Sequence, residues 1–129
     1  MMERFPDIEV YLARVTLDDI NAWLQEALNA PPLNPAGKGK WKTRGKHEGE
    51  EVPVLLVDSA ADGFASLWFD SHHTPWHTDQ ECAQHAAEAL QIEVRCSLGG
   101  WHPGDDPDRF WQVLPGGQEK AIEWPDSGR

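Results

Sequence analysis

The chain lacks most of the features that would take it out of the class of ordinary folded domains. Only 2 of its 129 residues are cysteine, which excludes a disulfide-dense secreted scaffold and makes a reducing cytoplasm the expected location. No stretch approaches about 18 uninterrupted apolar residues, so we expect no helix that spans a membrane. Residues 1–6 lack a basic segment followed by an apolar one, and we therefore expect no signal peptide.

The short motifs that mark common enzyme chemistry are missing as well. The sequence contains no Gly-rich phosphate loop, no recognisable nucleophile–base pair and no metal motif of defined spacing. Small enzymes can still assemble their sites from scattered loops. The sequence alone therefore leaves open whether the chain is an enzyme.

Basic residues are scarce, with 11 lysines and arginines against 22 acidic residues and a formal net charge of −11 at pH 7. This balance disfavours a broad nucleic-acid footprint and favours solubility or a basic partner. The content of 40% hydrophobic and 26% charged residues is typical of a globular protein. Because we find neither an internal repeat nor a linker, we expect a single domain over residues 1–129.

Apolar spacing and capping residues predict the elements of this domain. Thr16 and Thr78 each precede an apolar stripe with helical spacing, as N-cap residues do. Pro31 and Pro32 should end the first helix near Asn29. The expected strands lie at 8–13, 51–58, 64–70, 92–97, 110–114 and 119–124.

The order of these elements, β-α-β-β-α-β and a final hairpin, predicts an α+β fold of the ferredoxin-like kind. In that fold a four-stranded antiparallel sheet carries both helices on one face, and a C-terminal β-hairpin is added here. Residues 31–50 are expected to form a long polar and basic connection between the first helix and the second strand.

The basic connection contains the first candidate site. From Lys38 to Lys46 a cation stands at every second position, with a tryptophan among them. In an extended conformation these charges would project from one side, where they could hold phosphates while the indole stacks on a base. The alternative is a solvated loop whose cations pair with the acidic surface of this chain or of a second copy. The candidate ligand-binding residues are Lys40, Trp41, Lys42 and Arg44.

A histidine-rich loop forms the second candidate site. Residues 70–79 contain three imidazoles and two carboxylates, which are groups that suit zinc. The spacing matches no established zinc signature, so histidines that face water or cap backbone groups are the alternative, and a general acid–base histidine is a further one. The candidate metal ligands are Asp70, His72, His77 and Asp79.

Seven tryptophans are many for a chain of this length. Trp68 alternates to the sheet face opposite its two neighbours, alongside Tyr11 of the first strand. Helices on one side of the sheet would leave this face open, and exposed apolar patches usually mark interfaces. We therefore expect Tyr11 and Trp68 to lie in an interface, covered by the C-terminal hairpin through Trp111 or Trp124, by a second subunit, or by a ligand in a groove.

The two cysteines, Cys82 and Cys96, fall on core faces near the same end of the expected fold. We expect them to be neighbours in space. The favoured interpretation is a pair of reduced, buried thiols, and a reversible disulfide is the alternative.

Three functions are compatible with these observations. The first is a non-catalytic binding or regulatory module that acts through its acidic surface and open sheet face, with a protein partner or a second copy of itself. The second is a metal-dependent, hydrolase-like enzyme that uses the loop from His72 to Asp79. The third is a binder of small phosphorylated ligands that uses residues Lys38 to Lys46. We favour the first, and expect no cofactor unless the histidine-rich loop holds zinc.

Overall fold

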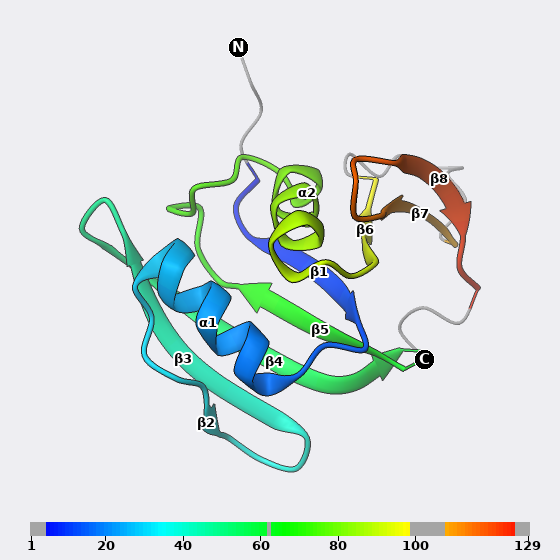
Figure 1. Cartoon of the computed structure of the whole chain (residues 1–129). Coiled ribbons are helices and arrows are strands. Elements are labelled where there is room, and N and C mark those ends of the chain that lie inside the picture. The colour runs from blue at the N-terminus through cyan, green and yellow to red at the C-terminus, as the bar shows by residue number, and fades with distance from the viewer. Residues whose placement is uncertain (1–4, 62, 99–107, 126–129) are drawn as a thin grey trace.

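The computed structural model describes residues 5–61, 63–98 and 108–125 of the chain (Figure 1). Within these residues it shows an α+β fold with two helices and one eight-stranded antiparallel sheet. The strands follow the order β2-β3-β4-β5-β1-β6-β7-β8 across the sheet. The elements are β1 (Ile8–Ala13), α1 (Leu17–Leu28), β2 (Asn34–Pro35), β3 (Lys40–His47), β4 (Glu50–Ala61), β5 (Phe64–Phe69), α2 (Asp79–Leu90), β6 (Val94–Ser97), β7 (Arg109–Val113) and β8 (Glu119–Glu123).

Both helices begin where the sequence indicates. The side chain of Thr16 caps α1 by accepting a hydrogen bond from the backbone N–H of Asp19 at 3.1 Å. Thr78 caps α2 in the same way, through the backbone N–H of Glu81. Asn29 ends α1 in the left-handed conformation that asparagine tolerates. In the described ranges neither helix has the length and apolar character needed to cross a membrane.

One face of the sheet forms the main hydrophobic core. Alternate residues of β1, β4 and β5 are buried on it, and the strand register places Val10 beside Leu67 and Leu67 beside Leu56. α2 packs against β1, β6 and β7, α1 packs against β3 and α2, and Figure 1 draws both helices in front of the sheet. Buried residues of the helices join the same hydrophobic cluster. We call this side of the sheet the helix face and the opposite side the open face.

The prediction of a long connection over residues 31–50 is wrong, because much of this segment forms strands. β3 pairs along its whole length with β4, and the short β2 pairs with the first part of β3. The strand pattern is weak in the sequence because the buried side of β3 carries Thr43 and Gly45 instead of large apolar residues. A Cβ atom at Gly45 would lie 2.5 Å from Cβ of Leu28, so the glycine allows α1 to approach the strand closely.

The sheet also differs from the expected ferredoxin-like sheet, because it has eight strands instead of four. The four strands predicted between residues 8 and 97 correspond to β1, β4, β5 and β6, which are neighbours in the order β4-β5-β1-β6. β2 and β3 extend the sheet on one side. The C-terminal hairpin forms as β7 and β8, and it extends the sheet on the other side by pairing with β6. The open face is therefore much wider than the sequence indicates.

Candidate binding groove on the open face

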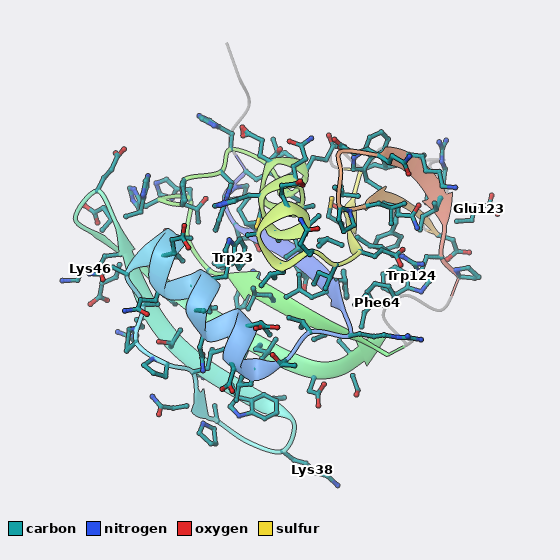
Figure 2. All side chains as sticks on the ribbon, viewed as in Figure 1. Trp23, Lys38, Lys46, Phe64, Glu123 and Trp124 are labelled. Atoms are coloured by element: carbon teal, nitrogen blue, oxygen red, sulfur yellow. The ribbon has the colours of Figure 1, made fainter. Side chains whose placement is uncertain are left out.

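One half of the open face is covered by the protein itself. Trp124, which follows β8, is 3% exposed, and its ring centroid lies 4.9 Å from that of Phe64 and 5.2 Å from that of Tyr11. Figure 2 shows Phe64 and Trp124 close together at this side of the molecule. The guanidinium of Arg95 stacks on the same rings, 4.5 Å from the centroid of Phe64 and 4.7 Å from that of Trp124. We call this aromatic cluster, which also contains Phe110, the covered half.

The other half of the open face, over β3, β4 and β5, is hollowed into a groove of about 580 Å³. The register places Lys42 beside Leu55 and Leu55 beside Trp68, so these three side chains form a row across three strands. The row begins with a cation, continues with an aliphatic side chain and ends with an indole. We call this part of the open face the groove half.

A second row runs parallel to the first. Arg44 stands beside Pro53, and the backbone N–H of Asp70 donates to the carbonyl of Pro53 at 2.9 Å. The outer wall of the groove is the segment that follows α1, including Pro31 and Asn34. This segment is fixed to β3 because the hydroxyl of Thr43 donates to the carbonyl of Pro31 at 2.8 Å. The groove is therefore built on the sheet and not on a free loop.

The groove is cationic at the β3 end and acidic at the β5 end. Within the described residues Lys42 takes part in no ion pair, and Arg44 pairs with Glu51 at 3.4 Å. That pair stabilises the fold little, because the two side chains are 71% and 60% exposed. At the other end the exposed Asp70 lines the groove. Lys42 and Arg44, the two cations that line the groove, thus remain accessible to a bound anion.

The two residues predicted to lie in an interface belong to different halves of the open face. Tyr11 lies under Trp124 in the covered half, whereas Trp68 lines the groove. The indole N–H of Trp68 donates to the carboxylate of Asp7 at 2.7 Å. Because indole has only this one donor, the groove surface that Trp68 contributes has no further hydrogen-bond donor to offer.

The candidate ligand-binding residues divide in a similar way. Lys42 and Arg44 line the groove. Trp41 belongs to the opposite face of β3, where it packs against the main core and cannot join them. Lys40 is the first residue of β3, paired with Val57 and outside the groove lining. Figure 2 shows how far the basic segment extends, with Lys38 and Lys46 at its opposite ends.

Three of the four candidate metal ligands are exposed or only partly buried, and they make separate contacts. The rings of His72 and His73 contact each other in a tilted arrangement, with centroids 4.0 Å apart. Nδ1 of His77 lies 3.3 Å from the carboxylate of Glu81, one helical turn along the chain. The third, Asp70, lines the groove. In the part of the chain that the structure describes, no three His, Cys, Asp or Glu side chains are placed to hold a metal ion. The zinc site and the hydrolase function stay predictions.

The fourth candidate ligand, Asp79, is buried and links secondary-structure elements through hydrogen bonds. Its side chain accepts hydrogen bonds from the backbone N–H of Glu9 at 3.1 Å and from the hydroxyl of Ser97 at 3.0 Å. Burial raises the pKa of Asp79 to about 6, although these two hydrogen bonds oppose the shift. The nearby charges of Asp7 and Glu9 add to it. Asp79 thus joins the start of α2 to β1 and β6.

Cys82 and Cys96 are free, and both are buried in the main core. Burial raises the pKa of both thiols, and the charge of Asp79 raises them further. Cys96 contributes to the shift at Cys82, as expected for neighbouring groups. Thiols in such surroundings are poor nucleophiles.

The apolar floor of the groove, to which Pro53 and Leu55 of β4 contribute, was not predicted from the sequence. Pro53, Leu55 and Val57 alternate with the buried Val52, Val54 and Leu56, so β4 carries apolar residues on both faces. The continuous apolar pattern of residues 52–57 in the sequence indicates that the open face of β4 is also apolar. The position of this face beside Lys42 is not indicated by the sequence, because it depends on the pairing of β3 with β4.

No family model, no curated protein and no solved structure matches the chain. The function therefore has to be argued from the groove itself.

Proposed function

We propose that this chain is a non-catalytic binding module that takes up an anionic partner on the groove half of its open face. The observation that supports this most directly is the difference between the two halves of one sheet surface. Trp124 shields the covered half, whereas the groove half leaves Leu55 and Trp68 partly exposed beside two cations. Apolar surface that stays open on a rigid sheet, with a few charged groups beside it, is typical of a binding site.

The distribution of charge favours an anionic partner. The chain has 22 acidic residues and only 11 basic ones, yet five of the basic residues fall between Lys38 and Lys46. Lys42 and Arg44 bring two of these charges to the groove. The acidic surface elsewhere would repel an anion and so direct it toward this basic strand. In this proposal the acidic surface supports recognition, and the open face makes the contacts.

Titration of the full chain with anionic probes, followed by backbone amide NMR, tests the proposal. The probes are inorganic phosphate, a short glutamate peptide and adenosine 5′-monophosphate. We expect at least one of them to move the signals of the β3, β4 and β5 residues that line the groove. The response should weaken as salt is added, because the contact is electrostatic and partly exposed.

A matched pair of variants separates the groove from general charge. The variant Lys42→Gln/Arg44→Gln should lose the response, because both cations that line the groove are removed. The variant Lys38→Gln/Lys120→Gln removes the same charge outside the groove and should keep it. The proposal is wrong if no probe moves the groove signals, or if the two variants respond alike.

A further inference from the structure

We propose that the natural ligand of the groove is a small anion that carries a planar ring, of the nucleoside monophosphate class. Its phosphate would lie between Lys42 and Arg44, and its ring on Trp68. This inference rests on the proposed function and makes it more specific, because it names the chemistry of the partner. Four features of the groove support it.

The first feature is the cationic end. Lys42 and Arg44 are two residues apart on β3, so their side chains leave the same face of the sheet about 7 Å apart at the backbone. A phosphate group can accept hydrogen bonds from both, and the fork of an arginine suits its tetrahedral oxygens. Lys42 has no competing ion pair in the described residues, and the pair between Arg44 and Glu51 is long and exposed.

The second feature is the platform beside the cations. Leu55 separates Lys42 from Trp68, so the indole lies two strands away, about 10 Å across the sheet. That span is comparable to the separation between the phosphate and the far side of the base in an extended nucleotide. Stacking of a base on an aromatic ring is favourable and tolerates any base, because every base has a π face. Trp68 is held for this role by its bond to Asp7, which fixes the edge of the ring.

The third feature is the acidic group at the far end of the groove. Asp70 lies two strands from Arg44, in the same relation as Trp68 to Lys42. Its carboxylate would accept hydrogen bonds from the amino group of a base or the hydroxyls of a ribose. An acidic peptide laid across the strands would instead meet Asp70 with a like charge. Because the groove has cations at one end and a carboxylate at the other, it favours a ligand with one anionic end over a polyanion.

The fourth feature is the size of the groove. Its volume of about 580 Å³ falls within the range of about 300–1,000 Å³ that is usual for small-molecule sites. The outer wall formed by Pro31 and Asn34 limits the groove at the edge of the sheet. Such a space suits a nucleotide better than the surface of a folded partner.

Calorimetric titration of the full chain with three probes tests the inference. Adenosine 5′-monophosphate carries both the ring and the phosphate. Adenosine carries the ring without the phosphate, and inorganic phosphate is the anion alone. We expect the nucleotide to bind at least about tenfold more tightly than either of the other two, since only it can use both ends of the groove. Equal affinity for phosphate and the nucleotide would mean a plain anion site and would overturn the inference.

Variants assign the two contacts. Lys42→Gln/Arg44→Gln should weaken nucleotide binding about tenfold or more and leave the weak binding of adenosine unchanged. Trp68→Leu should weaken the binding of the nucleotide and of adenosine, while Trp68→Phe, which keeps an aromatic ring, should restore most of it. The control variant Lys38→Gln/Lys120→Gln should bind like the wild type. Nucleotide binding that all these variants leave unchanged would place the ligand elsewhere and contradict the inference.

The failure of this inference is distinguishable from failure of the proposed function. If the glutamate peptide moves the groove signals and no nucleotide binds, the groove is a docking site for an acidic segment, and only the inference is wrong. If neither probe nor inorganic phosphate binds at the groove, both proposals are wrong.

Discussion

The covered half and the groove half belong to the same face of one sheet, but they differ in how their aromatic residues are packed. In the covered half the buried rings of Trp124 and Phe64 pack against the partly buried rings of Phe110 and Tyr11, with Arg95 stacked on two of the rings. In the groove half the single indole of Trp68 lies beside an open space lined by Lys42 and Arg44.

This difference separates stability from recognition. An aromatic cluster centred on a buried ring contributes to folding through the apolar area that it buries. An indole that is only partly buried contributes less to folding, and its ring remains available to a ligand. Trp124, just after the C-terminal hairpin, packs over Phe64 of β5 and Tyr11 of β1. In the described residues no aromatic side chain packs over β3 and β4 in this way.

The comparison predicts its largest effect at Trp124. We expect Trp124→Ala to lower the free energy of unfolding by about 3–5 kcal/mol, because it opens a cavity between Phe64, Tyr11 and Phe110. Trp124→Phe should cost much less, because the indole N–H has no hydrogen-bond partner among the described residues that would be lost. Urea unfolding of the two variants measures both values. Similar losses for Ala and Phe would contradict the assignment of this ring to packing.

A somewhat smaller effect is expected at Gly45, under the groove half. A Cβ atom there would lie 2.5 Å from Cβ of Leu28 and 2.8 Å from its carbonyl oxygen. Because the backbone of α1 cannot move away freely, Gly45→Ala should lower the free energy of unfolding by about 1–3 kcal/mol. Urea unfolding measures this loss. Gly39→Ala cannot serve as its control, because Gly39 has a positive φ, which alanine adopts only with strain. A neutral Gly45→Ala would show that α1 does not approach β3 as closely as the structure indicates.

The next effect concerns Asp79, which joins β1 to β6. Because the pKa of Asp79 is about 6 in the folded chain and lower when unfolded, the folded state holds its proton more tightly. Stability should therefore fall by about 2 kcal/mol as the pH rises from about 4 to about 7. Asp79→Asn keeps an acceptor for the N–H of Glu9 and removes the titration.

The measurement is the difference in unfolding free energy between wild type and Asp79→Asn at several pH values. Contributions from groups that do not interact with Asp79 are common to both proteins and cancel in this difference. We expect the variant to gain relative to the wild type as the pH rises. Parallel pH profiles would show that Asp79 does not titrate in this range and that its surroundings are more polar than the structure indicates.

How much of this could be predicted from the sequence depends on whether the signal was local. Thr16 and Thr78 fixed the helix starts because capping acts within four residues. β3 was missed because its core side holds Thr43 and Gly45, whose burial depends on α1 lying directly above. The alternation of cations from Lys38 to Lys46 was the remaining trace of a strand.

The candidate site was predictable only in part for the same reason. The sequence singled out Lys42 and Arg44 by their spacing and Trp68 by its alternation, but as members of separate sites. These three residues line the same groove only because β3 pairs with β4 and β4 with β5, which brings together residues far apart in the chain. Trp41 was grouped with the cations by proximity in sequence, and the strand period places it on the other face.

The smallest effect on stability is expected at Trp68 itself. Trp68→Ala should lower the free energy of unfolding by only about 1 kcal/mol, because the ring is partly exposed and borders an open groove. Thermal or urea unfolding, run beside Trp124→Ala, tests the comparison between the two halves. If Trp68→Ala destabilised the fold as much as Trp124→Ala, the groove half would be part of the core and not a site kept open.

The most direct test of the central claim is to follow the indole N–H signals of Trp68 and Trp124 by NMR while adenosine 5′-monophosphate is added. The variants Trp68→Phe and Trp124→Phe identify the two signals. The account predicts that the Trp68 signal moves with nucleotide concentration and that the Trp124 signal stays in place. A moving Trp124 signal beside an unchanged Trp68 signal would contradict the claim that the groove half is the binding surface.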